Sequence, residues 1–200
     1  MPNANLGNMI FVDQNNDNKL DAADVVQLGN RDPKWILGLG NTVSYKKFDL
    51  NVFVYGRFNQ YMDNNYAGFY NPARIAGVDA QNTLVGISNV WSADRPNGTY
   101  PGIAANPYSG SNPAGATDFY QRDVSFLRLR NVSLGYTINA KKFVRSARLF
   151  LDIQNLGVLT NYEGYDPEGS AFGTATSLPG VDQGRYPLAK TYLVGLNIGF

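Results

Sequence analysis

Large apolar residues alternate with small or polar residues along much of the chain, most clearly in its last eleven residues. Between Lys190 and Phe200, every second residue is large and apolar: Tyr192, Val194, Leu196, Ile198 and Phe200. Because successive side chains of a β-strand point to opposite faces, the segment predicts a strand with one apolar and one polar face. Its length matches the roughly 9–11 residues of a tilted strand that crosses a bilayer, although an edge strand of a soluble sandwich alternates in the same way.

The same alternation predicts two hairpins earlier in the chain. Residues 34–58 form the first, with a short basic turn at Lys46-Lys47. Its first strand has a predicted outward set made of Trp35, Leu37, Leu39, Val43 and Tyr45. Residues 122–158 form the second hairpin, with a strand from about Val124 to Ile138, a turn over 139–146 and a strand that begins near Leu149.

The apolar positions change phase within the strand that ends at Ile138. Leu127 and Leu129 share one phase, whereas the apolar residues from Val132 to Ile138 share the other. A β-bulge at Arg130-Asn131 explains the change, because a bulge adds one residue and moves the following side chains to the other face. The alternative is that Arg128 and Arg130 face a lumen and the upper part of the strand extends beyond the bilayer.

Short and long connections alternate between these strands. The connections after Tyr45 and Ile138 are short, and residues 1–33, 59–121 and 159–189 are long. Bacterial barrels have short periplasmic turns and long extracellular loops, so the order predicts an all-β, antiparallel transmembrane β-barrel whose terminal strand is 190–200. Five strands do not close such a barrel, which needs about eight or more, and open edges leave unpaired groups in lipid. We therefore expect the chain to be a fragment of a larger barrel.

Composition narrows the function classes. Charged residues make up 16% and aromatic residues 13%, which suits a barrel with aromatic girdles. The absence of Cys and His removes thiolate metal sites and imidazole catalysis, so an enzyme is not favoured. A net charge of +1 provides no electrostatic footprint for nucleic acid. Residues 1–8 have neither the basic nor the apolar region of an export signal, which also favours a fragment.

Residues Asp13 to Asp24 have the spacing of a calcium-binding loop. The side-chain ligands would be Asp13, Asn15, Asp17, Asp21 and Asp24, and Lys19 would contribute its backbone carbonyl. Two departures from the EF-hand pattern are Asn18 in place of glycine and Asp24 in place of glutamate. Two interpretations stay open: a structural calcium site and a solvated turn rich in Asn and Asp.

Two other groups of residues carry candidate chemistry. Glu163, Asp166 and Glu168 lie in a Gly/Pro-rich loop, where turn formation explains them better than acid–base catalysis. The loop over 59–121 contains an aromatic set that can stack on sugars, meet a partner protein or pack at the membrane interface: Tyr66, Phe69, Tyr70, Trp91, Tyr100 and Tyr108.

Taken in order, several motifs resemble the C-terminal part of SusC/RagA-type TonB-linked outer membrane proteins. The resemblance covers nearly the whole chain and rests on Asp13–Asp24, Leu28-Gly29-Asn30, Pro33-Lys34-Trp35, Tyr45–Leu50, Phe126–Thr137, Gln154-Asn155-Leu156, Gly164–Glu168, Tyr186-Pro187, Thr191-Tyr192 and Phe200. It implies the last five or so strands of a 22-stranded barrel in the outer membrane of a Gram-negative bacterium. The N-terminal plug and the segment that contacts TonB have no counterpart here. The terminal aromatic Phe200 would serve barrel assembly.

The resemblance also implies the transport function. A receptor of this type imports oligosaccharides or peptides, is powered through TonB and is covered by a SusD-like surface lipoprotein. Two alternatives remain. A siderophore or cobalamin receptor is disfavoured by the Asp13–Asp24 loop and by Gly164–Glu168, and a soluble calcium-stabilised β-sandwich that binds glycans would have the same strand alternation.

Overall fold

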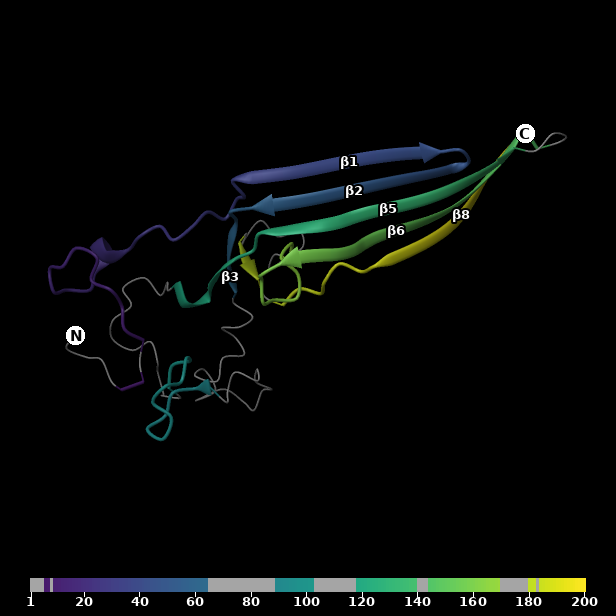
Figure 1. Ribbon diagram of the computed structural model, residues 1–200. Helices are drawn as coiled ribbons and strands as arrows, with labels where there is room; N and C mark the ends of the chain where they lie inside the picture. Colours follow the sequence, from purple (N-terminus) through teal and green to yellow (C-terminus); the bar gives the residue numbers. More distant parts are fainter. Residues whose placement is uncertain are drawn as a thin grey trace. The chain divides into compact units, whose positions relative to one another are not determined.

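The structure is a computed structural model that describes residues 6–7, 9–64, 89–102, 118–139, 144–169, 180–182 and 184–200 (Figure 1). Its contacts divide the chain into two units. One unit contains Met1–Gly29, Asp63–Arg122 and Val181–Gly184, and the other contains Asn30–Met62, Asp123–Gly180 and Arg185–Phe200. No helix in the described ranges is both long and apolar enough to cross a membrane.

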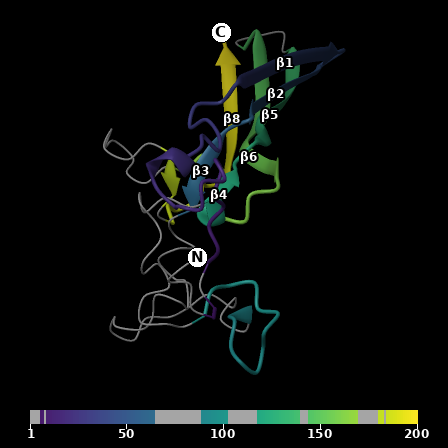
Figure 2. The ribbon, with the colours of Figure 1, turned by 90° about the vertical axis from the view of Figure 1, so that its left-hand side faces the viewer.

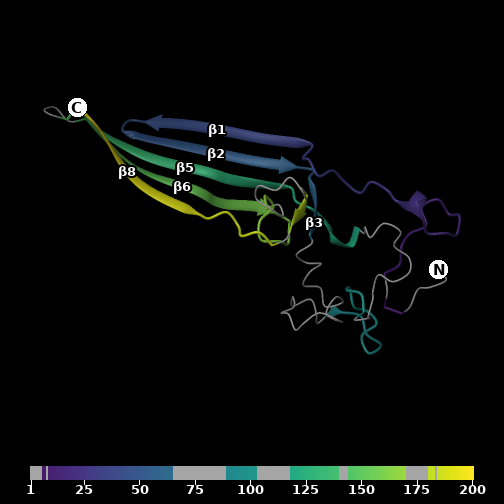
Figure 3. The same ribbon diagram turned by 180° about the vertical axis from the view of Figure 1, so that it is seen from behind.

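The second unit is built on a five-stranded antiparallel sheet. Its strands are β1 (Trp35–Tyr45), β2 (Phe48–Phe58), β5 (Phe126–Asn139), β6 (Ser146–Thr160) and β8 (Thr191–Gly199). They lie side by side in the order β1-β2-β5-β6-β8, which Figures 1 and 3 show from opposite sides. The predicted all-β, antiparallel class is confirmed for the described residues.

The chain visits the five strands in sequence, so its connections fall alternately at the two ends of the sheet. Lys46-Lys47 joins β1 to β2 with Lys46 at a φ of 55°, and residues 140–145 join β5 to β6. The long stretches 59–125 and 161–190 begin and end at the opposite end. We refer to these as the turn end and the loop end of the sheet.

The five strands form one twisted layer. Figure 2 shows that β1 and β8 point in clearly different directions, as expected from the twist between neighbouring strands. Every residue of β1 is exposed. The apolar set of β8 is also exposed, with fractions of 63% for Tyr192, 71% for Val194, 57% for Leu196, 48% for Ile198 and 81% for Phe200. A soluble sandwich would bury these side chains against a second sheet.

Strand register places apolar residues on one face and polar residues on the other. One row across all five strands is entirely apolar: Val43, Leu50, Leu134, Leu151 and Val194. The neighbouring row is Thr42, Asn51, Ser133, Asp152 and Leu193. Since adjacent residues of a strand face opposite sides, the sheet has an apolar face and a largely polar face.

The predicted β-bulge is present. The pairing of β5 shifts between Leu129 and Asn131 against β6, and the pairing of β2 with β5 shifts between Phe53 and Val54. Arg130 is the extra residue of β5 relative to β2. The bulge lets Leu129 and Val132 share the apolar face, although their positions differ by three and regular alternation would place them on opposite faces.

Strand β6 begins earlier than the sequence predicts. It starts at Ser146, and its first two residues pair with Asn139 and Ile138 of β5. Ser146 and Ala147 are small, so they do not produce the apolar alternation that starts at Leu149. Continued backbone pairing with β5 extends the strand beyond the amphipathic pattern.

A second, three-stranded sheet has the order β4-β3-β7. Its strands are β3 (Tyr61–Asn64), β4 (Gln121–Asp123) and β7 (Val181–Asp182), and β3 pairs with β7 in parallel. The described residues also contain the 3₁₀ turns η1 (Ala22–Asp24) and η4 (Asp118–Tyr120). Of the aromatic set predicted in the long loop, Trp91 and Tyr100 are described, and Tyr66, Phe69, Tyr70 and Tyr108 lie outside the described residues.

Candidate functional site

The apolar face of the sheet has aromatic side chains at both ends. At the loop end, Trp35 pairs with Phe58. At the turn end, Tyr45 pairs with Phe48, whose ring lies 4.7 Å from that of Tyr136. Leucine, valine and isoleucine dominate the rows between these ends. Aromatic side chains on both sides of an aliphatic band are typical of a lipid-facing barrel surface, because their rings favour the two membrane–water interfaces.

The polar face carries hydrogen bonds between neighbouring strands. Asn51 Nδ2 donates to Thr42 Oγ1 at 2.8 Å, and Asn131 Nδ2 donates to Asp152 Oδ1 at 2.7 Å. Each pair connects two adjacent strands, so the polar side chains satisfy one another along this face. Such a face tolerates water, as the lumen side of a barrel must.

An ion pair on the polar face spans three strands near the turn end. Arg148 of β6 binds Asp49 of β2, and both side chains are 29% exposed. The pair crosses β5 at Gly135, where an added Cβ would meet both side chains. The missing side chain of Gly135 therefore makes room for a contact between strands that are not neighbours.

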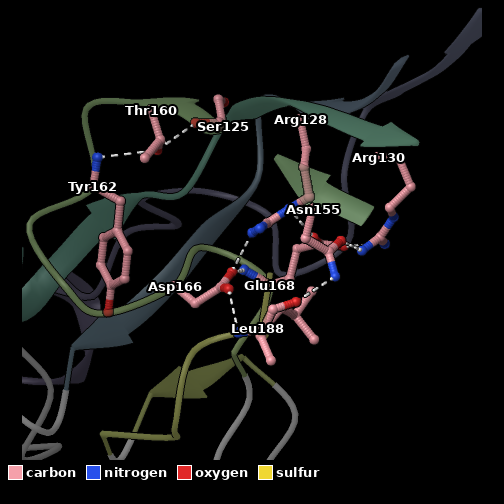
Figure 4. Close-up of polar contacts among 10 residues, drawn as sticks. Ser125, Arg128, Arg130, Asn155, Thr160, Tyr162, Asp166, Glu168 and Leu188 are labelled. Atoms are coloured by element: carbon pink, nitrogen blue, oxygen red, sulfur yellow. Dashed lines mark hydrogen bonds and ion pairs between the residues drawn. The ribbon is translucent and has the colours of Figure 1, made fainter. Parts of the chain in front are cut away.

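A buried group of charges lies at the loop end (Figure 4). Arg128 Nη2 is 2.6 Å from Asp166 Oδ1, and Arg128 Nε is 2.6 Å from Glu168 Oε2. Arg130 Nη2 reaches Glu168 Oε1 at 2.8 Å. The side chains of Arg128, Asp166 and Glu168 are only 4%, 5% and 9% exposed. Two arginines and two carboxylates balance each other's charge, which burial requires.

The same residues bind the backbone around the start of β8. Asp166 accepts hydrogen bonds from the N–H of Glu168 at 2.9 Å and from the N–H of Leu188 at 3.0 Å. Asn155 of β6 accepts from Arg130 at 3.2 Å and donates to the carbonyl of Ala189 at 3.0 Å. We call Arg128, Arg130, Asn155, Asp166 and Glu168 together the latch.

The sequence interpretation of the carboxylates around Asp166 was incomplete. Asp166 does support a turn, since it binds the N–H of Glu168, but Asp166 and Glu168 also form the buried ion pairs. Glu163 is exposed. The sequence feature that points to these ion pairs is the presence of Arg128 and Arg130 in one strand, because two arginines there need carboxylates to balance their charge.

The acidic loop Asp13–Asp24 is held by its own side chains. Asp13 accepts hydrogen bonds from the N–H of Asp17 and Asn18, and Asp17 accepts from the N–H of Lys19. Asn18 has a φ of 64°, the left-handed conformation that asparagine tolerates. Asn15 Oδ1 accepts from the N–H of Asp17 at 3.0 Å.

The last turn of this loop closes on Asp24 in a capping box. Asp21 accepts from the N–H of Ala23, and Asp24 accepts from the N–H of Asp21 and of Gln14. The bond from Asp21 holds the pKa of the Asp24 carboxyl below its ordinary value, and the Gln14 N–H adds to this effect. In the described part of the chain, no three acidic side chains converge as a metal cage. The calcium site stays a prediction.

A one-layer antiparallel sheet with an exposed apolar face, aromatic ends and a hydrogen-bonded polar face is the wall of a transmembrane β-barrel. Comparison with known proteins identifies the type of barrel. No family model matches the chain.

Curated relatives match almost all of this chain. TonB-dependent receptor P39 of Formosa agariphila is 32% identical over 203 residues, which cover 97% of this chain and 19% of that protein. TonB-dependent receptor SusC of Bacteroides thetaiotaomicron is 25% identical over 196 residues, which cover 96% and 17%. The chain thus spans about a fifth of the length of these relatives.

Solved structures agree. The RagAB peptide transporter matches with a TM-score of 0.68 at 22% identity over 92% of this chain and 20% of that chain. The RagAB peptide importer in its open-open state matches with a TM-score of 0.65 at 26% identity over 84% and 17%. Over nearly its whole length the chain is therefore similar to SusC/RagA-type TonB-dependent receptors, the resemblance that the order of its motifs predicts.

Proposed function

We propose that the chain forms part of the barrel wall of an outer-membrane transporter that imports nutrients in a TonB-dependent manner. The observation that carries this proposal is the exposed apolar face that continues across all five strands while the opposite face is polar. The outer edges of β1 and β8 also favour a larger barrel, because unpaired strand edges in lipid cost several kcal/mol per group.

A matched pair of substitutions on β8 tests the orientation of the wall. In the complete protein that contains this chain, Val194→Arg places a charge on the apolar face, where a mid-membrane arginine costs about 2–4 kcal/mol. We expect the folded protein in the outer membrane to fall sharply. Leu193→Arg is the control, since its side chain lies in the polar row with Asp152. Equal loss for both variants would contradict the proposed orientation.

We propose that the cargo is an oligosaccharide or a peptide and that a SusD-like surface lipoprotein covers the transporter. The names of relatives favour these classes: SusC is a TonB-dependent receptor, and the RagAB structures are described as a peptide transporter and importer. TonB would act on a part of the receptor outside this chain. All these relatives are receptors or transporters by name, in keeping with the prediction that the protein is not an enzyme.

Growth measurements distinguish the cargo classes. A strain that lacks the complete receptor is grown on oligosaccharides or on peptides as the single carbon source, beside the parent strain and a strain without TonB. Loss of growth on one cargo class in both mutants supports the proposal and assigns the cargo. Growth on every substrate in the receptor mutant, while the TonB mutant fails, would remove this receptor as the importer. Co-purification with a surface lipoprotein tests the partner.

The calcium site in Asp13–Asp24 is a separate proposal. It is supported by the oxygen spacing of the loop and by the left-handed conformation at Asn18, the position that the EF-hand pattern gives to glycine. Any bound calcium would have a structural role, since its ligands would be the side chains that already hold this loop together.

A further inference from the structure

The pairing register of β8 needs a cause other than its connection to β6. Register in a hairpin is fixed by a short turn, and β1–β2 has such a turn at Lys46-Lys47. In contrast, residues 161–190 separate β6 from β8. A connection of that length permits many registers. A shift by one residue would move the whole apolar set of β8 to the polar face.

Two hydrogen bonds fix the chain just before β8 begins at Thr191. Asp166 accepts from the N–H of Leu188 at 3.0 Å, and Asn155 donates to the carbonyl of Ala189 at 3.0 Å. The two bonds hold consecutive residues: Leu188 through its backbone N–H and Ala189 through its backbone carbonyl. The two bonds therefore place the residues immediately before β8, next to the β6–β8 pair of Gln154 with Thr191.

These two anchors are themselves fixed to the sheet. Asn155 is a residue of β6, with a φ of 53°. Asp166 lies in the long connection, but its carboxylate is bound by Arg128 of β5 and is 95% shielded from solvent, since its side chain is 5% exposed. Glu168 binds both Arg128 and Arg130 and holds the same turn against the β5 bulge.

We propose that the latch sets the register of β8 against β6. Arg128 and Arg130 act as positioning residues through Asp166 and Glu168, and Asp166 with Asn155 places Leu188 and Ala189. The turn residues of a short hairpin are replaced here by a buried ion-pair group that acts across a long connection. This inference concerns the sheet itself and does not depend on what the protein transports.

One feature inside the strand pair offers an alternative cause. The ring of Phe150 lies over Gly195, where an added Cβ would clash with the ring. A shift of two residues would bring Leu193 or Asn197 opposite Phe150. The contact therefore disfavours some registers without the latch, and the experiment has to separate the two causes.

Disulfide cross-linking measures the register directly, because the chain contains no cysteine. The complete protein is used, with any cysteine elsewhere replaced by serine. The pair Leu151→Cys and Val194→Cys reports the observed register. Leu151→Cys with Leu193→Cys or with Leu196→Cys reports a shift by one or by two residues, since a disulfide needs closely spaced Cα atoms. Cross-linked peptides from outer membranes are quantified by mass spectrometry.

Each reporter pair is combined with Asp166→Asn, Asn155→Ala or Asp49→Asn. Asp166→Asn removes the charge that Arg128 binds, and Asn155→Ala removes the bond to Ala189 while all four latch charges stay paired. Asp49→Asn is the matched control, because it breaks an ion pair on the same face that does not contact the start of β8. We expect the ratio of native to shifted cross-link to fall at least about tenfold for the two latch variants, since buried pairing is lost or β8 is released, and to stay unchanged for Asp49→Asn.

The outcomes are decisive even if Asp166→Asn fails to assemble. Asn155→Ala leaves no buried charge unpaired, so its cross-links then decide the question. A native cross-link alone in assembled Asn155→Ala overturns the proposal and leaves Phe150 and Gly195 as the cause of the register. Shifted cross-links in Asn155→Ala with a native pattern in Asp49→Asn support it. Equal shifts in the latch variants and in Asp49→Asn also overturn it.

Discussion

The polar face carries two arginine–carboxylate groups that differ mainly in burial. Asp49 and Arg148 are each 29% exposed near the turn end, whereas Arg128, Asp166 and Glu168 are less than a tenth exposed at the loop end. Exposed pairs contribute about 0–1 kcal/mol, but removing one partner of a buried pair costs about 3–5 kcal/mol. Arginine–carboxylate pairing thus stabilises the sheet only weakly at the turn end, whereas at the loop end it holds residues 166–168 against β5.

The largest expected effect comes from breaking the buried group. Arg128→Gln leaves Asp166 without its arginine and Glu168 with only Arg130, and it should lower the free energy of unfolding of the complete protein by about 3–5 kcal/mol. Arg148→Gln is the matched control and should cost about 1 kcal/mol or less. Thermal unfolding in detergent, followed by the heat-dependent mobility of the barrel on gels, measures both. Similar losses would show that burial does not distinguish the two groups.

The next effect concerns the contact of β6 with β8. Gly195→Val places a side chain where the Phe150 ring lies, and overpacking of this kind costs typically about 1–3 kcal/mol. Gly157→Val is the control on β6, because no atom lies within 4 Å of the Cβ it would add. The same unfolding measurement applies. A Gly195→Val protein as stable as the control would mean that Phe150 turns away at little cost.

A smaller effect is expected where the partly exposed pair of Asp49 and Arg148 crosses β5. Gly135→Ala puts a Cβ against the ends of Arg148 and Asp49. Both side chains can move away from the added Cβ on the polar face, so the expected loss is that of the pair itself, about 1 kcal/mol or less. Combining Gly135→Ala with Asp49→Asn should then add little further loss. Full additivity of the two changes would show that the backbone, and not the ion pair, bears the strain.

The smallest effect belongs to the acidic loop. Because the pKa of Asp24 is lowered in the folded loop, its contribution is present above the ordinary carboxyl pKa and is lost as pH falls through the lowered value. The protection of the Asp21 and Gln14 amides against exchange, measured relative to the intrinsic rate at each pH, should therefore fall only in acid, and Asp24→Asn should remove this pH dependence. If the loop binds calcium, millimolar calcium slows the same exchange at neutral pH in the parent but not in Asp24→Asn. Exchange that ignores calcium would contradict the calcium proposal.

Local periodicity predicted the strands well, because each strand has an apolar face on one side and a polar face on the other. The two hairpins, the terminal strand and the phase change at Arg130 all follow from which neighbours are apolar. The start of β6 was missed, since Ser146 and Ala147 fit either face equally well. Their pairing with β5 carries no amphipathic signal.

Periodicity did not predict the ion pairs of the latch, because they join residues that are far apart in the sequence. Arg128 and Asp166 are 38 positions apart, and the intervening chain contains a strand pair whose geometry brings them together. A sequence shows the charges but not which pairs become buried. Asp166 and Glu168 lie in a Gly/Pro-rich loop, where turn formation alone explains carboxylates. The loop sequence by itself therefore does not indicate that both also form buried ion pairs with arginine.

The bulge at Arg130 has a consequence for how this strand tolerates length changes. Deletion of Arg130 would restore uninterrupted alternation and keep every side chain from Val132 to Ile138 on its present face, but it would remove the guanidinium that binds Glu168. An insertion in the connection between β5 and β6, residues 140–145, would leave the apolar and the polar face of the sheet unchanged. Natural variants of β5 should accordingly lose or gain residues at its turn end, and a variant without the extra residue beside Leu129 should also lack the ion pair between Arg130 and Glu168.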